Sequence, residues 1–413
     1  MLFGDTREAS NLLDTIIKQR VVADRDKDSL LVSTDPGDSF VASLPIEEHI
    51  CTCNSVSKGS IISAVQQEKL STVDEVRQYT KASSSCGGCK PAVSELLAYI
   101  QSDHFDEVVE QIAFCDCTTL TEEEVVWQIQ MRSLVNAQEV REKLEWENKA
   151  GCPTCRPALG YYLSMIYPDY NQENEGLLFE ERMRAATQSN GTLTVVPQFY
   201  GGILDTKKLR KITNVTEKYA LNQIAIASDQ RIHLLGVRQD ELSGLLDDLN
   251  MPIRSSGESL VEPIQTNICE YACQCDQSLI MASELDEKME FLKTPFRIKV
   301  AISACEHNGA ESMTKDIGVI KVKRGWEMYV GGSNEANVRS GNLLCVVSTE
   351  QETCEMITGF IQYYRESANY LERIWQWMNR VGLIHIREAL FDEEIREHLL
   401  KNFDADRSRK KAI

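Results

Sequence analysis

The first 155 residues of the chain contain eight cysteines, and all of them occur in close pairs. The pairs are C-x-C at Cys51 and Cys53, C-x-x-C at Cys86 and Cys89, C-x-C at Cys115 and Cys117, and C-x-x-C at Cys152 and Cys155. Six further cysteines lie beyond residue 268. In a reducing compartment, paired cysteines more often hold a metal or do redox chemistry than form structural disulfides. Metal binding is therefore the first hypothesis.

The paired cysteines belong to an internal repeat. With an offset of 64 residues, CTCNSVSKGSIISAVQQEKLSTVDEVRQYT aligns with CDCTTLTEEEVVWQIQMRSLVNAQEVREKL. Two extra residues then enter the second copy, after which CGGCKPAVSELLAYI aligns with CPTCRPALGYYLSMI. Each copy reads as C-x-C, about thirty residues of amphipathic helix, and C-x-x-C at the start of another helix. We therefore expect four thiolates to converge in each copy.

Four-cysteine sites hold either tetrahedral zinc or an iron–sulfur cluster. Structural zinc sites usually pair two C-x(2–4)-C knuckles, and a C-x-C half is less typical of them. Each C-x-x-C turn is followed by a cation, Lys90 or Arg156, and then by Pro91 or Pro157, a residue favoured at the first helical position. Helix N–H groups and the cation would stabilise a negatively charged thiolate cluster. The cysteine spacing favours an iron–sulfur cluster in each copy and leaves a tetrahedral zinc site as the alternative.

Two motifs, C-x-C-N-S-V-x-K-G from Cys51 and C-G-G-C-K-P from Cys86, resemble the bacterioferritin-associated-ferredoxin (BFD) type of [2Fe-2S] module. The tandem arrangement resembles the middle of the large subunit of NAD(P)H-dependent assimilatory nitrite reductases. The second copy has Asp116 and Pro153-Thr154 where the first has Thr52 and two glycines, so a repeat that keeps only the fold is the alternative there. The ligands that the resemblance implies are Cys51, Cys53, Cys86 and Cys89 for one [2Fe-2S] cluster, and Cys115, Cys117, Cys152 and Cys155 for a second.

The rest of the chain resembles the same family in the family's own order. Residues 1–44 resemble the tail of a flavin and nicotinamide reductase domain. No G-x-G-x-x-G follows a strand, so FAD and NAD(P)H would bind a missing or separate reductase domain. The expected divisions after that tail are BFD-like modules at 45–103 and 104–166, a linker at 167–190, a ferredoxin-like half domain at 191–254, and a siroheme and [4Fe-4S] type domain at 255–408.

The expected fold class is multidomain: two small helical modules, an α+β ferredoxin-like half domain and an α+β nitrite/sulfite reductase-type domain. From residue 191 the pattern predicts strand, helix, strand, strand, helix. Cys345 is predicted to lie in the core and Cys354 to be inert, and the basic tail from residue 404 is predicted to be disordered. The other predicted elements are helices at 8–19, 269–285, 350–380 and 392–401, and strands at 296–303, 318–322, 327–330 and 343–348.

The resemblance implies a siroheme whose iron shares a cysteine thiolate with a [4Fe-4S] cluster. Its four cysteines are spaced C-x5-C and then C-x3-C, and the last one is the bridge. Gly309 stands where the bridging cysteine should be, so we expect a domain that keeps its fold without a working cluster or siroheme. A cluster of altered type, or an intact but unusual site, is the alternative. The candidate ligands that remain are Cys269, Cys275 and Cys305, with Cys273 and His307 as substitutes.

Cations of this domain are candidates for anion binding. By the resemblance, Arg231, Arg297 and Lys299 occupy positions that meet siroheme carboxylates or nitrite. Arg297 and Lys299 would share one face of a strand, because side chains alternate with a period of two. Ordinary edge-strand charges are the alternative interpretation.

Charge and hydropathy exclude two classes of partner. Lys and Arg number 44 against 63 Asp and Glu, a formal net charge of −19, and a chain this acidic repels the phosphate backbone of nucleic acid. No stretch approaches the roughly 18 to 20 apolar residues of a membrane-spanning helix. The N-terminus lacks the basic and apolar regions of a signal peptide. We therefore expect a cytoplasmic protein that binds neither nucleic acid nor membrane.

The missing bridging cysteine favours electron transfer over nitrite reduction. The hypothesis is a component of assimilatory nitrate or nitrite reduction that passes electrons from an NAD(P)H-flavin reductase domain or subunit, through [2Fe-2S] clusters, to a partner reductase subunit. Such a chain is an oxidoreductase component with no catalytic residue of its own. Nitrite reduction to ammonia at siroheme is the first alternative, and a zinc-stabilised scaffold without a redox role is the second.

Overall fold

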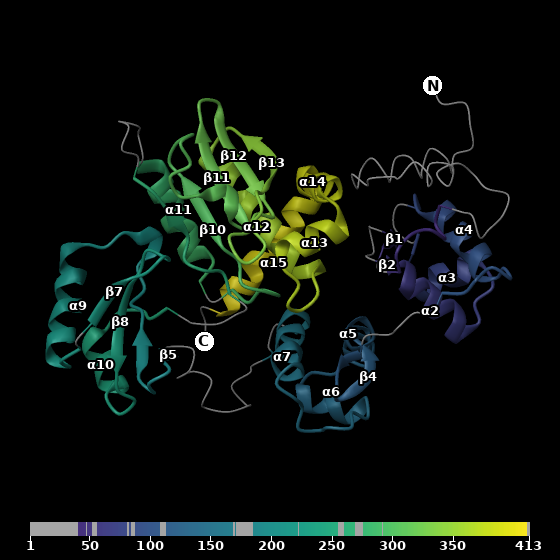
Figure 1. The fold of residues 1–413 in the computed structure, drawn as a ribbon, viewed down its shortest axis with the longest axis horizontal. Coiled ribbons are helices and arrows are strands. Elements are labelled where there is room, and N and C mark those ends of the chain that lie inside the picture. The colour runs from purple at the N-terminus through teal and green to yellow at the C-terminus, as the bar shows by residue number, and fades with distance from the viewer. Residues whose placement is uncertain are drawn as a thin grey trace. The chain divides into compact units, whose positions relative to one another are not determined.

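The computed structural model describes residues 40–46, 48–51, 56–80, 82–83, 87–107, 113–167, 170, 185–221, 223–254, 260–268, 276–290 and 292–410 (Figure 1). The chain divides into two compact units, and each is described by itself. The first comprises Met1–Ile112 with Gln376–Phe391, and the second comprises Ala113–Trp375 with Asp392–Ile413. The predicted helix over 8–19 lies outside the described residues.

The first unit contains the first cysteine module. Its elements are β1 (His49–Cys51), β2 (Val56–Ser57), α2 (Lys58–Glu68), α3 (Val73–Thr80) and α4 (Lys90–Ile100), with β1 antiparallel to β2. Ser57 begins α2 because its side chain accepts the backbone N–H of Ser60 at 3.1 Å. Fully buried side chains from three helices, among them Ile61, Val76 and Leu96, form the core. Helix α14 (Leu383–Phe391), which sequence analysis missed, also belongs to this unit.

The second module repeats this plan at the start of the second unit. Its elements are β3 (Ala113–Cys115), β4 (Thr118–Thr121), α5 (Glu122–Met131), α6 (Ala137–Lys143) and α7 (Cys155–Ile166). An offset of 64 carries the first residues of β1, α2 and α3, which are His49, Lys58 and Val73, onto those of β3, α5 and α6, which are Ala113, Glu122 and Ala137. The predicted repeat is confirmed.

The Glu-Val-Arg triplet common to both copies has a structural cause. Glu75 and Glu139 each accept the backbone N–H of the residue four positions earlier, at 2.8 and 3.1 Å. Each carboxylate thereby caps the start of the middle helix of its module. Val76 and Val140 are both fully buried in the core of their module. In each module, therefore, the glutamate stabilises the start of the middle helix and the valine packs that helix against the core.

A four-stranded sheet follows the second module. Its elements are β5 (Ala185–Thr187), β6 (Leu193–Val195), the 3-10 helix η5 (Tyr200–Gly202), α9 (Thr206–Lys218), β7 (Gln223–Ile226), β8 (Ile232–Val237) and α10 (Leu242–Leu249), with strand order β5-β6-β8-β7. The order predicted from residue 191 is confirmed. The last residues of the linker predicted at 167–190 include strand β5, which pairs with β6. The sequence did not indicate this strand, because three residues are too few to show an alternating pattern.

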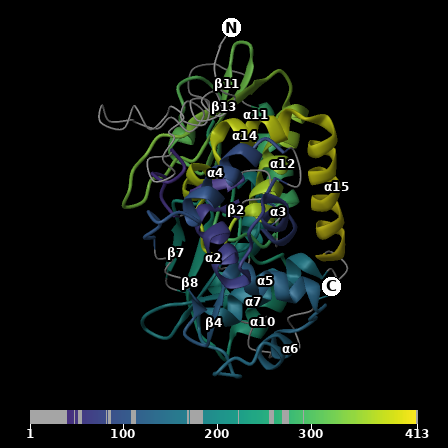
Figure 2. The same ribbon diagram turned by 90° about the vertical axis from the view of Figure 1, so that its right-hand side faces the viewer.

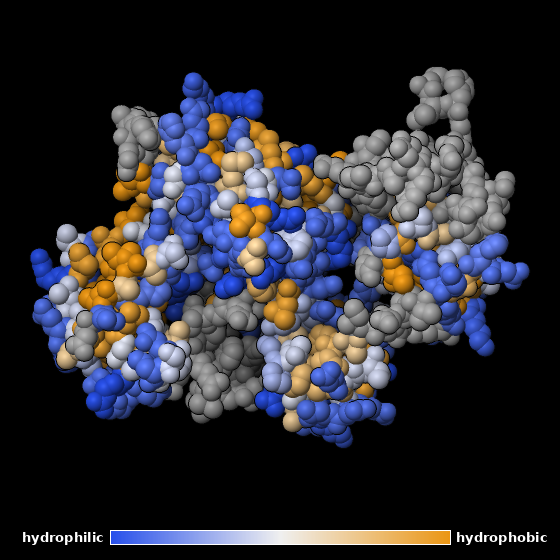
Figure 3. Space-filling model, in the orientation of Figure 1, coloured by the Kyte–Doolittle hydropathy of each residue, from blue (hydrophilic) through white to orange (hydrophobic). Residues whose placement is uncertain are grey.

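One face of this sheet is covered and the other is exposed. Side chains of α9 and α10 share a core with β6 and β8. On the edge strand β7, Ile224 and Ile226 point away from that core and are 50% and 81% exposed. Figure 3 shows an apolar patch over the part of the molecule where Figure 1 places β7.

The C-terminal domain is built on a five-stranded sheet of order β13-β12-β11-β10-β9. Strands β9, β10 and β11 run parallel, and β12 and β13 continue the sheet antiparallel. Helix α15 lies alongside α12 (Figure 2). The elements are β9 (Gln265–Thr266), α11 (Asp276–Lys288), β10 (Val300–Ser303), the 3-10 helix η6 (Ser312–Thr314), β11 (Ile317–Val322), β12 (Gly325–Val330), β13 (Asn342–Val347), α12 (Glu350–Ser367) and α15 (Glu393–Lys410). Helix α13 (Ile374–Val381) begins here, and its residues from Gln376 onward belong to the first unit.

Three predictions for this domain were wrong in detail. The strand predicted at 296–303 begins only at Val300. The single helix predicted at 350–380 is α12 followed by α13, because Ala368 is extended and ends the first helix. The tail predicted to be disordered continues α15 to Lys410, where Asp406 pairs with the buried side chain of Arg365.

The multidomain fold class, helical modules followed by two α+β domains, is confirmed. Cys345 is buried as predicted. In the part of the chain that the structure describes, no helix combines the length and apolar character that crossing a bilayer requires.

Candidate metal centres

Four cysteine sulfurs converge in the second module. Cys115 ends β3, Cys117 follows in the turn before β4, and Cys152 and Cys155 flank the turn that opens α7. All four sulfur atoms lie within 4.8 Å of one another. Among the described residues this is the only cluster of three or more potential metal ligands. A tetrahedral site with metal–sulfur bonds of about 2.3 Å separates its sulfurs by about 3.8 Å, so the arrangement fits a four-thiolate metal centre.

Backbone N–H groups point at two of these sulfurs. The N–H of Cys152 donates to the Sγ of Cys155 at 3.1 Å, and the N–H of Cys155 donates to the Sγ of Cys152 at 3.4 Å. Burial opposes ionisation of Cys152, but hydrogen bonds from the N–H groups of Cys155 and Thr154 and from the side chains of Cys155 and Cys117 together outweigh it and lower the pKa of this thiol to about 6. Such hydrogen bonds to sulfur stabilise the thiolate form that binds metal.

The other thiols need a cation to ionise. Burial raises the pKa of Cys115 and of Cys155, since a thiolate there is poorly solvated. A metal centre would supply the compensating positive charge. Gly151, which sequence analysis missed, makes room for the group: its φ is +76°, and a Cβ there would lie 3.2 Å from the Sγ of Cys155.

The first module presents two of its four candidates in the same places. Cys51 is buried at the end of β1, and the half-buried Cys115 stands at the corresponding end of β3. Cys89 caps the start of α4, where the repeat places Cys155 at the start of α7. Cys53 and Cys86 lie outside the described residues.

Residues from the C-terminal third of the chain border the first module. The Nη1 of Arg380 lies 3.3 Å from the Nε2 of His49, two positions before Cys51. Burial lowers the pKa of His385 on α14, and the Cys51 thiol acts in the opposite direction on it. No local pattern could have indicated these neighbours, because they come from a segment more than 300 residues away in the sequence.

In the C-terminal domain the side chain of Asn267 fills the space beside Gly309. Cys305 is buried just after β10, and Gly309 follows it in the same loop. A Cβ at Gly309 would lie 2.6 Å from the Nδ2 of Asn267. The Asn267 side chain is itself held in place, because its Oδ1 accepts the N–H of Ala304 at 3.1 Å. A cysteine side chain at position 309 does not fit this arrangement.

Side-chain hydrogen bonds close this loop. The Oδ1 of Asn308 accepts the N–H of Ser312 at 2.7 Å and the hydroxyl of Ser303 at 3.1 Å. The Oγ of Ser303 in turn accepts the N–H of Ala310 at 3.1 Å. These amide and hydroxyl hydrogen bonds fix the loop. Of the remaining candidate ligands, Cys269 and Cys275 lie outside the described residues.

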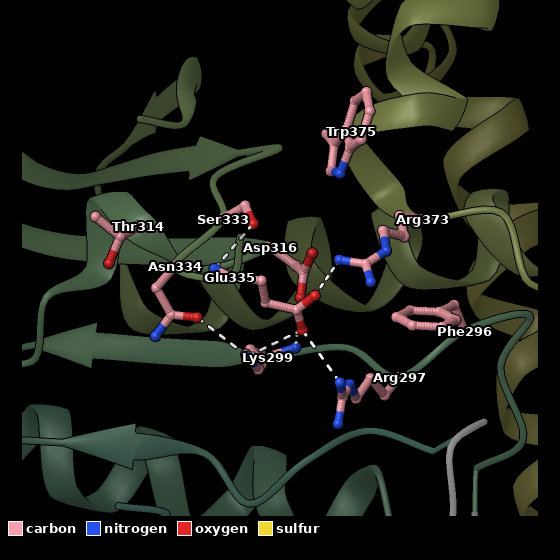
Figure 4. Close-up of a pocket in the computed structure, with 10 residues that line it drawn as sticks. All are labelled: Phe296, Arg297, Lys299, Thr314, Asp316, Ser333, Asn334, Glu335, Arg373 and Trp375. Atoms are coloured by element: carbon pink, nitrogen blue, oxygen red, sulfur yellow. Dashed lines mark hydrogen bonds and ion pairs between the residues drawn. The ribbon is translucent and has the colours of Figure 1, made fainter. Parts of the chain in front are cut away.

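The three candidate anion-binding cations are in two different places. Arg231 is fully buried and pairs with Asp286 at 2.5 Å, so its charge is already matched. Arg297 and Lys299 instead meet at one pocket, where both pair with Glu335 at 3.3 and 3.2 Å (Figure 4). Sequence analysis missed Glu335, because nothing in its neighbourhood marks it as the partner of residues nearly forty positions earlier.

Family models match three kinds of domain along the chain. The BFD-like [2Fe-2S] binding domain matches residues 49–99 and again 114–165. The nitrite/sulfite reductase ferredoxin-like half domain matches 186–252, and the nitrite and sulphite reductase 4Fe-4S domain matches 261–399. The chain therefore contains two BFD-like modules followed by the two kinds of domain that the nitrite and sulphite reductase models describe. Its two cysteine modules are of the [2Fe-2S] type.

Two curated relatives align with nearly the whole chain. A nitrite reductase [NAD(P)H] of Bacillus subtilis is 41% identical over 97% of this chain and 50% of its own length. An assimilatory nitrate reductase electron transfer subunit of the same organism is 37% identical over 99% of this chain and 51% of its own length. An assimilatory-type sulfite reductase of Nitratidesulfovibrio vulgaris is 27% identical over 48% of this chain and 92% of its own. The chain spans about half the length of the first two relatives, and these relatives are oxidoreductases.

Proposed function

We propose that this chain is an electron-transfer component of assimilatory nitrate or nitrite reduction. It receives electrons from an NAD(P)H-flavin reductase domain or subunit and passes them to a partner reductase subunit. The observation that carries the proposal is the match of two tandem modules to a [2Fe-2S] binding domain, one of which gathers Cys115, Cys117, Cys152 and Cys155 at one point.

Each cysteine quartet holds one [2Fe-2S] cluster in this proposal. A bound [2Fe-2S] cluster takes up and releases one electron at a time while its iron stays ligated. The chain's own contribution is to gather four thiolates and to aim the N–H groups of Cys152 and Cys155 at sulfur, which favours the negative charge of the site. The first module has the same framework around Cys51 and Cys89. Its ligand set is Cys51, Cys53, Cys86 and Cys89.

The loop around Gly309 favours electron transfer over nitrite reduction by this chain. The family's siroheme site takes a bridging cysteine at the position of Gly309, and Asn267 fills the space where that side chain would lie. Arg297 and Lys299, which would meet siroheme carboxylates or nitrite, are paired with Glu335. These residues do not fit a siroheme bridged to a [4Fe-4S] cluster. The second candidate function is nitrite reduction, which the match of residues 261–399 to the 4Fe-4S domain favours.

The test is the optical spectrum and the nitrite reductase activity of the chain purified without oxygen. We expect the broad brown absorbance of [2Fe-2S] clusters, no siroheme bands, and no nitrite-dependent oxidation of a reduced viologen dye. Reduction of the clusters by a flavin reductase and NAD(P)H, followed by oxidation on addition of the partner reductase, would support the electron route. Strong siroheme bands together with nitrite-dependent dye oxidation would show that the chain is a nitrite reductase instead.

A further inference from the structure

A loop of the C-terminal domain places one carboxylate among three cations. Glu335 lies in the connection between β12 and β13. Its Oε1 is 3.3 Å from Arg297 and 3.2 Å from Lys299, and its Oε2 pairs with Arg373. Figure 4 shows the carboxylate pointing to the middle of these cations, and the two arginines lie over the ring of Phe296.

The loop holds Glu335 in this position. Ser333 and Arg339 exchange two backbone hydrogen bonds, at 3.0 and 2.9 Å, which close the loop at its base. The N–H of Glu335 donates to the Oγ of Ser333 at 3.3 Å, and Lys299 also donates to the side chain of Asn334 at 3.0 Å. The carboxylate is therefore presented to the cations by a closed loop.

The cations come from two separate segments of the chain. Arg297 and Lys299 precede β10, and Arg373 precedes α13. Three cations gathered at one point repel one another unless an anion lies between them. A carboxylate that accepts hydrogen bonds from Lys299 and Arg373 and pairs with Arg297 has the contacts that a small oxyanion makes in a protein site. Glu335 therefore stands where such an anion would bind.

Positive charge remains in excess around the pocket. The other carboxyl group that lines it is Asp316, which accepts the backbone N–H of Lys299 at 2.8 Å. Even with both carboxyls ionised, three positive charges face two negative ones, in a chain whose net charge is −19. The pocket is a local exception to the acidic character of the molecule, and an anion can enter it favourably only if Glu335 leaves.

We propose that Glu335 is a built-in anion that closes a small-oxyanion site formed by Arg297, Lys299 and Arg373. The native chain keeps this site shut with its own carboxylate, and removing the negative charge of Glu335 opens it to an inorganic oxyanion. The inference concerns the C-terminal domain and does not depend on what the cysteine quartets hold.

The test is calorimetric titration of the full chain with inorganic sulfate, with chloride used to keep ionic strength constant. Sulfate should bind E335Q at least about tenfold more tightly than the native chain, because the neutral amide no longer competes for the cations. The double variant R297Q/E335Q should lose most of that gain. E327Q is the matched control: Glu327 lies on β12 outside the pocket, where it accepts the hydroxyl of Tyr329 at 2.8 Å.

Thermal unfolding gives a second readout that does not depend on equal stability of the variants. Sulfate should raise the midpoint of E335Q by more than the general salt effect that it has on the native chain and on E327Q. The proposal is overturned if the native chain binds sulfate as tightly as E335Q does. It is equally overturned if E335Q gains neither affinity nor sulfate-dependent stability, or if R297Q/E335Q keeps the whole gain.

Discussion

The carboxylate of Glu122 accepts the backbone N–H of Tyr370 at 2.8 Å and so joins the second cysteine module to the C-terminal domain. The corresponding residue of the first module, 64 positions earlier, is Lys58. Lys58 is fully buried and donates to two backbone carbonyls of the segment before β1, both at 2.8 Å. The same position of the repeat therefore binds a different neighbour in each module. It is a lysine that binds the segment before β1 in the first module, and a glutamate that binds the C-terminal domain in the second.

Replacing Glu122 should loosen this junction. In E122A the hydroxyl of Tyr162 loses its acceptor and the N–H of Tyr370 keeps only that hydroxyl, at 2.9 Å, which together cost about 1 to 3 kcal/mol. E122Q keeps an acceptor oxygen, and burial already raises the pKa of Glu122, so the neutral amide should cost little. Hydrogen exchange over residues 368–372 should accelerate in E122A and stay near the native rate in E122Q and in the exposed control E123A. Native exchange in E122A would contradict this role.

A cysteine at position 309 should strain the chain unless Asn267 is shortened. The new Cβ would lie 2.6 Å from the Nδ2 of Asn267, and overpacking of this kind costs about 1 to 3 kcal/mol. We therefore expect a lower thermal midpoint for G309C. In N267A/G309C the clash is gone, so the double variant should be more stable than the sum of the single effects predicts. Additive effects would show that the two positions do not compete for space.

Asp316 should make the stability of the C-terminal domain fall as pH rises. Burial raises the pKa of Asp316 from 3.8 to about 7, so the folded state holds a proton that the unfolded state releases. Its contribution to stability is therefore fully present below the unfolded pKa and is lost as pH rises through about 7, by about 4 kcal/mol at most. D316N, which cannot ionise, should gain thermal midpoint relative to the native chain between pH 4 and pH 8. A constant difference across that range would contradict the raised pKa.

The parts of the fold that the sequence predicts are those with a local pattern. The repeat predicted both modules because Cys51 and Cys115, with the helices that follow them, recur at a constant offset. The extension of α15 was missed because part of it depends on a distant pair, Asp406 with the buried Arg365.

The candidate sites follow the same rule. The convergence of the second quartet could be predicted from cysteine spacing, since all four ligands lie within 41 positions, from 115 to 155. Arg297 and Lys299 were recognised by resemblance, but their partner Glu335 comes from a loop that only the folded sheet brings near them. The neighbours of the first module, Arg380 and His385, are likewise set by tertiary structure alone.

The central claim is that both quartets hold [2Fe-2S] clusters, and counting the metal tests it most directly. Iron, zinc and acid-labile sulfide should be measured in the anaerobically purified native chain, in C152S and in the control C354S, with electron paramagnetic resonance of each reduced sample. We predict about four irons and four sulfides per native chain, two clusters of two irons each, and the same in C354S. In C152S the iron content should fall by about half, with one resonance lost and one retained. Zinc without iron or sulfide, or a C152S variant that keeps both resonances, would contradict the account.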